Sequence, residues 1–359
     1  EPEYFFPGPW LLYQNRDSNM TAGNILIFSP NTVFNDYISN VLPELGEENM
    51  QQTTFGEYLE QITGSELGFE SAASHMEYVL SLQTQKGQRI RFRSIAYKST
   101  MHFYELLNNY VTYLEQNAVN FEDITLEARV CHNPNESPWE KEVLIPKGYI
   151  REMYNVDYAS LPLVRRIEKL KQRLYFLIRT PWQERRLELE KKISDNPQYK
   201  GKIKAYSRLF VYQEFKPVRK QIETMLQFDS YQAFLDLFEN TRLFAGMAGN
   251  YLPEQYEDIC AHTAEQIRKR FLGYEDISAY SYLTGALAGT SSMSQIRHVV
   301  IDEAQDYTPV QYGIFRQLFP QTRMTLLGDF NQTIHPLRDD IGYEQVAEIR
   351  RSRPQAGKG

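Results

Sequence analysis

The sequence predicts an α/β fold in which a parallel sheet is interrupted by a large, mostly helical insertion. Strand–helix patterns occur near both ends of the chain, and about 230 residues of different character separate them. Near the start, the apolar run Ile25–Phe28 precedes an amphipathic pattern over Thr32–Leu42. A short run that is apolar on both faces is typical of a buried parallel strand, and a 3–4 spacing is typical of a helix.

The second α/β region begins near residue 296. It has predicted strands at Arg297–Ile301 and Met324–Leu327, with a helix at Pro309–Leu318 between them. A short strand is also predicted at Gln52–Phe55, before a helix that opens at Gly56. We therefore divide the chain into residues 1–60 and 291–348 for the α/β domain, 61–290 for the insertion and 349–359 for a tail.

Composition excludes several classes of protein. With 42% hydrophobic and 13% aromatic residues, the 359-residue chain can form ordinary cores in two or three domains. No apolar stretch approaches the length of about 18 residues that a membrane helix needs, and the acidic start is unlike a signal peptide. Two cysteines give no disulfide framework, which favours a cytoplasmic protein. Histidines 75, 102, 132 and 262 lack the spacing of metal ligands and are interpreted as structural.

Charge is distributed unevenly along the chain. The overall net charge is -7, yet residues 161–220 contain 17 basic and 6 acidic residues, a local net charge of +11. Helical patterns cover Arg165–Ile178, Trp182–Ile193 and Lys202–Leu226, with Thr180 and Pro181 as a predicted cap and first helical residue. The sequence therefore predicts an antiparallel basic arm over about 161–226.

One side of this arm is expected to project cations toward a partner, while the apolar residues Leu170, Leu174, Phe176 and Leu177 pack against the facing helix. The predicted partner-binding residues are Arg165, Arg166, Lys169, Arg185 and Arg186. The alternative is that these charges only solvate a helical surface.

The most informative segment is Val299–Asp306, an apolar strand that ends in two carboxylates. In open α/β folds ligands bind at the carboxyl ends of parallel strands. There Asp302 could hold the Mg²⁺ of a nucleotide, and Glu303 could orient and deprotonate an attacking water. Gln305 could couple this site to neighbouring elements.

The next predicted strand ends in a similar way. Asp329 follows Gly328 directly, and Gln332 lies three residues further on. The carboxyl ends of neighbouring parallel strands meet, so Asp329 and Gln332 are expected beside Asp302. The amide of Gln332 could contact the γ-phosphate and sense hydrolysis.

These segments resemble known motifs. Val299–Asp306 resembles motif II, and Leu327–Pro336 resembles motif III, of superfamily I helicases of the UvrD/Rep type. Asn24–Asn31 with the residues that follow it looks like the HelD branch, whose members carry a long helical insertion in the first motor domain. The resemblance implies a RecA-like P-loop NTPase fold, with ATP and Mg²⁺ as nucleotide and cofactor.

The resemblance also implies residues for single-stranded DNA. Ser29 and Asn31 match the motif Ia loop, and Thr54 and Phe55 lie where relatives carry motif Ib. Ile334 and His335 occupy motif III positions that reach toward bases in true helicases. A histidine is a poorer stacking platform than the aromatic residue usual there.

The sequence departs from this family in one respect. No Gly-x-x-x-x-Gly-Lys-Ser/Thr phosphate-binding motif occurs, and the later helicase motifs are absent as well. We expect an internal fragment of a larger motor, inactive alone and completed by a second motor domain. The leading hypothesis is a HelD-like motor that uses ATP to remodel RNA polymerase complexes. The alternatives are a helicase translocating on single-stranded DNA and a non-catalytic partner-binding fragment.

Overall fold

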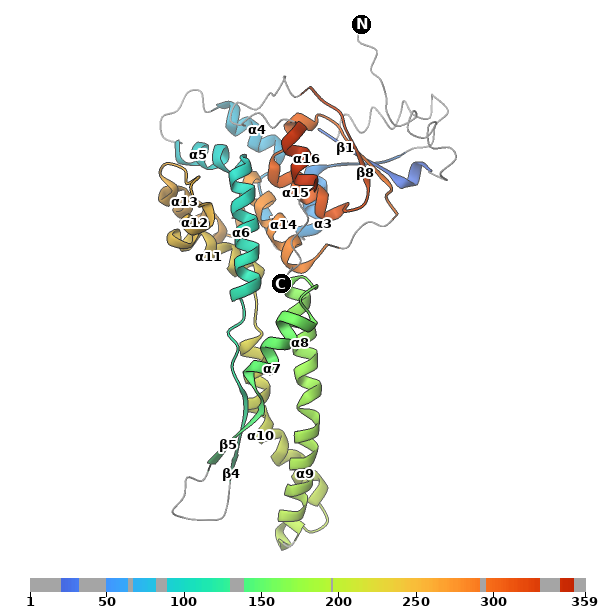
Figure 1. Ribbon diagram of the computed structural model, residues 1–359, viewed down its shortest axis with the longest axis vertical. Coiled ribbons are helices and arrows are strands. Elements are labelled where there is room, and N and C mark those ends of the chain that lie inside the picture. The colour runs from blue at the N-terminus through green and yellow to red at the C-terminus, as the bar shows by residue number, and fades with distance from the viewer. Residues whose placement is uncertain are drawn as a thin grey trace. The chain divides into compact units, whose positions relative to one another are not determined.

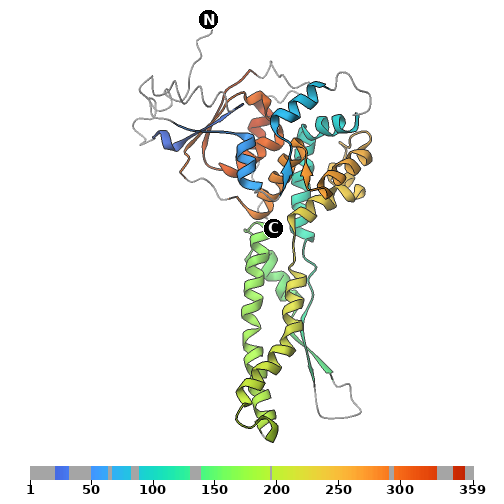
Figure 2. The same ribbon diagram turned by 180° about the vertical axis from the view of Figure 1, so that it is seen from behind.

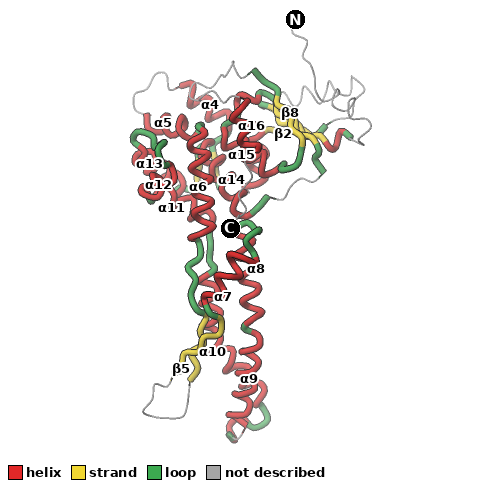
Figure 3. The backbone as a smooth tube through the Cα atoms, viewed as in Figure 1, coloured by secondary structure: helices red, strands yellow, loops and turns green. Residues whose placement is uncertain are grey.

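The computed structural model describes residues 21–31, 50–63, 67–81, 89–129, 139–194, 196–290, 295–329 and 343–351. These residues form two compact units, each described here by itself. Unit 1 combines residues 1–111 with 230–354, and unit 2 is formed mainly by residues 112–229. Strands are confined to three small sheets within the described ranges, and the remaining regular structure is helical (Figure 3).

Unit 1 contains a four-stranded parallel sheet. Its order is β2 (Gln51–Thr54), β1 (Ile25–Ser29), β7 (His298–Ile301) and β8 (Arg323–Leu326). Every residue of β1 and of β7 is buried. The prediction of a parallel sheet built from both ends of the chain is therefore confirmed.

Alternate residues of β1 pack against different layers, because side chains of a strand point to opposite faces. On one face, the Phe28 ring lies 4.7 Å from that of Phe315 in α15 (Pro309–Leu318) and 6.0 Å from that of Tyr58 in α3 (Phe55–Thr63). On the other face, Ile25 and Ile27 form a cluster with Val300. A strand covered on both sides explains the continuous apolar run in the sequence.

The start of α3 differs from the prediction. Phe55 was expected to end a strand, but it is the first residue of the helix and is buried. Its ring packs 5.8 Å from that of Tyr307 and 5.4 Å from that of Phe315. Phe55 thus starts α3 because its ring is buried between those of Tyr307 and Phe315, and this packing outweighs its preference for a strand.

The rest of unit 1 is mainly helical. Its remaining elements include a short parallel pair, β3 (Gly68–Phe69) with β6 (Phe271–Leu272). The helices are α4 (Ala72–Ser81), α5 (Arg89–Lys98), α6 (Met101–Asn117, which continues into unit 2), α11 (Ser230–Glu239), α12 (Thr241–Ala248), α13 (Tyr256–Arg268), α14 (Tyr274–Ala288) and α16 (Tyr343–Arg351). Helix α14 packs on both α15 and α3.

The boundaries of the two compact units differ from the boundaries predicted from the sequence. The expected boundaries were 60/61 and 290/291, whereas the units divide after Val111 and after residue 229. The reason is that α14, although it precedes residue 290, packs on helices that flank the parallel sheet. Residues 68–111 and 230–290 thus belong to the same compact unit as that sheet.

Unit 2 contains an antiparallel pair and three long helices. Strands β4 (Ile124–Arg129) and β5 (Trp139–Ile145) pair, and α7 (Lys147–Glu152) follows with a π-helical turn at Met153–Asp157. Helices α8 (Leu163–Leu177) and α9 (Arg179–Ser194) follow each other closely, and α10 (Ile203–Met225) packs along α9 (Figures 1 and 2). These helices occupy the residues for which the arm was predicted.

The junction between α8 and α9 differs from the predicted one. Thr180 was expected to cap a new helix, but α9 already begins at Arg179, and only Ile178 separates it from α8. The Ile178 side chain is buried and its backbone stays in the right-handed helical region, which keeps the two helices nearly continuous. Pro181 is tolerated because the first turn of a helix does not use its N–H groups. No helix among the described residues is long and apolar enough to cross a membrane.

Candidate functional site

The carboxyl ends of the four parallel strands form one edge of the sheet. The register aligns Ser29 with Thr54, Phe28 with Ile301, and Ile301 with Leu326. Residues that follow β7 and β8 therefore lie in the same row as the ends of β1 and β2. This arrangement brings Asp302, Ser29 and Thr54 to one edge, as expected of a ligand site in an open α/β sheet.

Asp302 and Glu303 are fixed by the backbone around them. The Asp302 N–H donates to the carbonyl of Phe28 at 2.9 Å, and the Glu303 N–H donates to Asp302 Oδ1 at 3.0 Å. Glu303 has a left-handed backbone (φ 48°, ψ 47°), which ends the strand sharply. Such a conformation is uncommon in residues other than glycine and is often found at functional sites.

Burial raises the pKa of the Asp302 carboxyl, and the neighbouring Glu303 charge adds to the increase. The Glu303 amide, which donates to the ionised carboxylate, acts in the opposite direction. A partly buried carboxylate beside a second one is an environment in which a bound cation would favour the charged form.

Gln305 lies between the segment that follows β7 and Gly328, which follows β8. Its side-chain amide donates to Glu303 Oε2 at 2.6 Å, and the residue is buried. The Ala304 N–H donates to the carbonyl of Leu327 at 2.7 Å, directly after β8. The backbone of Ala304 thus joins the segments that follow β7 and β8, and the coupling role of Gln305 stays a prediction.

The absence of a side chain at Gly328 allows Gln305 and Ala304 to approach the backbone at this position. A Cβ atom at residue 328 would lie 2.0 Å from Gln305 Oε1 and 2.9 Å from the Ala304 nitrogen, and the backbone φ is +154°. Sequence reasoning gave Gly328 no role of its own. It also missed Tyr312, whose hydroxyl donates to the carbonyl of Ala304 at 2.5 Å. The signal that could have indicated Gly328 is its position immediately before the predicted site residue Asp329.

The predicted nucleic-acid residues fall into different environments. Asn31 is exposed, and the buried Ser29 hydroxyl donates to the Asn31 carbonyl at 3.3 Å. The Thr54 hydroxyl accepts the Glu57 N–H at 3.2 Å. Phe55 is 3% exposed, so in this structure its ring belongs to the core and offers no stacking surface.

The structure describes only some of the residues predicted to form motif III. Asp329 is described and exposed at the same edge of the sheet. Gln332, Ile334 and His335 lie outside the described residues, so their predicted roles remain predictions.

The predicted partner-binding residues differ from one another in exposure. Arg165 has a 64% exposed side chain, and Lys169 is exposed. Arg166 is buried; its guanidinium donates to the carbonyls of Ala159 and Leu161 and lies 3.8 Å from Glu115 Oε1. Its side chain therefore points into unit 2, where it links α8 to the preceding loop and to Glu115 in α6, and it does not project outward.

Arg185 and Arg186 also make ion pairs within the arm. Arg185 pairs with Glu214 at 2.8 Å and with Glu188 at 2.5 Å, and Arg186 pairs with Glu190 at 2.8 Å. A further difference concerns the apolar face: Phe176 was expected to be buried and is 54% exposed. Of the five predicted residues, only Arg165 and Lys169 are therefore exposed on the arm, while the other three make contacts within unit 2.

Comparison with known families agrees with the site. Residues 168–340 match the model of the UvrD/REP helicase N-terminal domain, and this segment includes β7, β8, Asp302 and Glu303. The match supports a UvrD-like superfamily I helicase motor, with nucleotide and nucleic-acid binding as the family's general properties. No curated protein matches the chain.

Proposed function

We propose that this chain supplies part of the ATP-hydrolysing site of a helicase-like motor, with Asp302 as the Mg²⁺ ligand and Glu303 as the catalytic base. The observation that carries the proposal is the position of Asp302 and Glu303 at the carboxyl edge of the parallel sheet, next to the ends of β1 and β8. The match to the UvrD/REP helicase N-terminal domain supports it.

The side chains at this edge fit a hard cation. Mg²⁺ prefers carboxylate and water oxygens and is usually held by only one or two carboxylates. Oδ1 of Asp302 accepts the Glu303 amide, so we assign Oδ2 as the oxygen that would bind the cation. When bound, Mg²⁺ would neutralise charge on the nucleotide phosphates. We assign Asp329 and Gln305 to the same nucleotide site because they lie at or contact the neighbouring strand ends.

Glu303 would accept a proton from the attacking water. Its carboxylate already receives the Gln305 amide at 2.6 Å, so this hydrogen bond orients the carboxylate while its other oxygen serves the water. We propose Gln332 as the γ-phosphate sensor, and Asn31, Thr54, Ile334 and His335 as contacts to single-stranded DNA; Ser29, like Phe55, is buried and is left out of this set.

The first experiment compares ATP hydrolysis by a parent protein containing a phosphate-binding loop with that of its Glu303→Gln form. Removing a general base should lower kcat by about 10²–10⁴-fold while nucleotide binding persists. Glu344→Gln, on the exposed side of α16, is the matched control and should retain the wild-type rate. Wild-type turnover in Glu303→Gln would reject the assignment of the base.

Within this function, we propose HelD-like remodelling of RNA polymerase complexes as the task and translocation on single-stranded DNA as the second candidate. The basic arm supports the first. Lys169, Arg173, Lys191 and Lys192 are exposed and form no ion pair with any described residue. Concentrated positive charge suits an anionic partner surface, whereas a translocating motor needs phosphate contacts across its motor surface.

Charge reversal of these four residues to glutamate tests the arm without disturbing its internal ion pairs. We expect binding to RNA polymerase to weaken and its salt dependence to fall, while single-stranded DNA binding persists. Reversal of Arg268 and Lys269, at the C-terminal end of α13, is a control for charge reversal outside the arm, with a net-charge change of -4 against -8 for the four arm residues. Unchanged polymerase binding would leave the arm as a solvated surface, and loss of DNA binding alone would favour the translocating helicase.

A further inference from the structure

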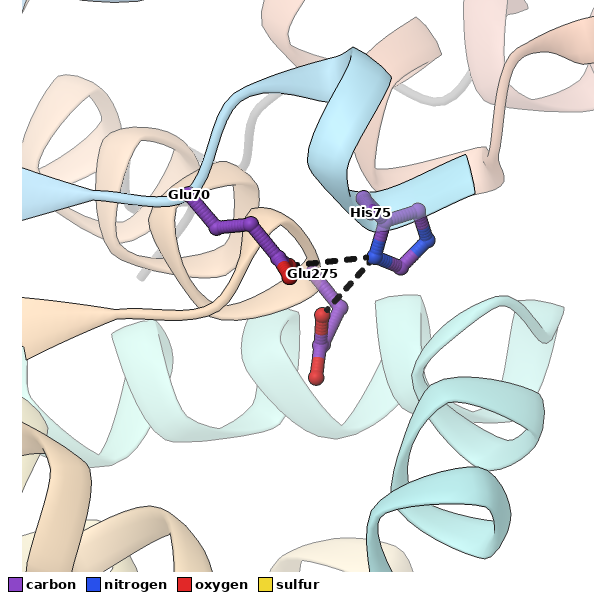
Figure 4. A group of neighbouring side chains, drawn as sticks. All are labelled: Glu70, His75 and Glu275. Carbon is purple, nitrogen blue, oxygen red and sulfur yellow. Dashed lines mark ion pairs between the residues drawn. The ribbon is translucent and has the colours of Figure 1, made fainter. Parts of the chain in front are cut away.

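Three side chains from distant parts of the sequence converge inside unit 1. Glu70 follows β3, His75 lies in α4, and Glu275 lies in the first turn of α14 (Figure 4). His75 Nδ1 is 3.4 Å from Glu70 Oε2 and 3.5 Å from Glu275 Oε2. The side chains of Glu70, His75 and Glu275 are only 11%, 6% and 7% exposed. One nitrogen and two oxygens therefore face a common point in a protected place.

The separations match those between two ligands of one metal ion. A hydrogen bond between a charged nitrogen and a carboxylate is about 2.7–2.9 Å long, which is shorter than both distances. Zinc binds nitrogen and oxygen at about 2.0–2.2 Å with tetrahedral geometry, so two of its ligands lie about 3.3–3.6 Å apart. All three donor atoms lie within 4.8 Å of one another.

Two cations lie near the cluster, and only one of them faces its carboxylates. Lys98 is committed to Asp276 at 2.5 Å and to Thr263 at 2.6 Å. Arg91 is the remaining cation: it donates to Glu70, and its Nε lies 3.7 Å from Glu275 Oε1. Glu70 and Glu275 thus share one guanidinium.

Glu275 provides a second, independent observation. Its Oε2 atom is buried and accepts no hydrogen bond from any described residue, although it points toward His75 Nδ1. Gly273 leaves room for this carboxylate, since a Cβ there would lie 2.9 Å from Glu275 Oε2. Carboxylates in metal sites are themselves commonly hydrogen-bonded, and the Tyr274 N–H and Arg91 do this for Glu70.

We propose that Glu70, His75 and Glu275 bind a divalent transition-metal ion of the zinc type. Imidazole with carboxylates suits such ions, whereas Mg²⁺ and Ca²⁺ favour oxygen ligands alone. A cavity of about 350 Å³ adjoins the site and is lined by Glu70 and Glu275 among others, so a water can complete the coordination. The ion would join β3 and α4 to α14, which are some 200 residues apart in the sequence. The ion would then stabilise the packing of these elements in unit 1, and its site is distinct from the proposed nucleotide site.

Metal binding by the full chain tests this proposal directly. The chain is stripped with a chelator and titrated with Zn²⁺ against a chromophoric competitor, and thermal unfolding is followed with and without Zn²⁺. We expect one ion per chain and a higher melting temperature with Zn²⁺. His75→Gln and Glu275→Gln should each weaken binding by at least about 10-fold, as loss of even outer-shell partners commonly does. His102→Gln is the matched control, because His102 is 42% exposed beside Glu105 and should not affect binding.

Two further measurements keep the test independent of folding defects in the variants. Co²⁺ bound to the wild-type chain should give a tetrahedral ligand-field spectrum without a thiolate band, which excludes binding by cysteine. Asp302→Ala should leave Zn²⁺ stoichiometry unchanged, because the proposed site is separate from the motor site. Absence of Zn²⁺ binding by the wild-type chain would overturn the proposal, as would unchanged affinity in a folded His75→Gln variant.

Discussion

Replacing Gly328 with alanine perturbs the contact between the ends of β7 and β8. The added Cβ would lie 2.0 Å from Gln305 Oε1 and 2.9 Å from the Ala304 nitrogen. The Gln305 side chain can move, but it then loses its 2.6 Å hydrogen bond to Glu303. The Ala304 nitrogen cannot retreat as easily, because it donates to the carbonyl of Leu327 at 2.7 Å.

The expected loss of stability follows from these two effects. Overpacking commonly costs about 1–3 kcal/mol, and a hydrogen bond to a charged group contributes about 1.5–3 kcal/mol. Since Glu303 is partly exposed, its hydrogen bond belongs at the lower end of that range. We therefore expect Gly328→Ala to lower the free energy of unfolding by about 2–4 kcal/mol, measured by urea denaturation.

A double-mutant cycle with Gln305→Ala separates the two contacts. Removing the Gln305 side chain abolishes the 2.0 Å overlap, so Gly328→Ala should cost at least about 1 kcal/mol less in that background. Gly246→Ala is the control, because nothing lies within 4 Å of a Cβ at this position in α12, and helix propensity favours alanine by about 0.5–1 kcal/mol. Additive effects of the two substitutions would refute the proposed interlock, as would a Gly328→Ala protein as stable as wild type.

Two predictions concern ion pairs at different depths. Lys98→Met leaves Asp276 buried without its partner and should lower the free energy of unfolding by about 3–5 kcal/mol. Lys269→Met removes one partner of an exposed ion pair and should change this free energy by less than about 1 kcal/mol. Equal shifts of the melting temperature in the two variants would refute the distinction. Arg185→Ala breaks a largely buried ion pair between α9 and α10 and should destabilise unit 2 by about 1–3 kcal/mol. Arg165→Ala, at an exposed pair, should be nearly neutral, and hydrogen exchange of α9 distinguishes these outcomes.

Local sequence patterns predicted the sheet and its edge well. The run Ile25–Phe28 and the segment ending at Asp302 are apolar on both faces, which only a covered parallel strand explains. Once the strands are parallel, Asp302 and the end of β1 must share an edge. The helix Pro309–Leu318 was likewise predictable because Thr308 caps it and proline follows.

The arm shows where local patterns stop being informative. Its helices follow from periodicity, but the exposure of each arginine depends on partners from other segments. Arg166 is buried because Glu115, 51 positions earlier, and the carbonyls of Ala159 and Leu161 surround it. Phe176 remains exposed because α10 packs mainly along α9 and contacts α8 less.

By itself, the sequence determined that strands from both ends of the chain form one parallel sheet, and that Asp302 and Glu303 directly follow one of these strands. Only the tertiary structure decided that Gly328 faces Gln305, and that Glu70 and His75 meet Glu275 from about 200 positions away. The physical reason is that hydrophobic periodicity and capping act between near neighbours in the chain. Convergence of polar side chains depends on how whole helices pack, and that is decided by burial summed over residues far apart in the sequence.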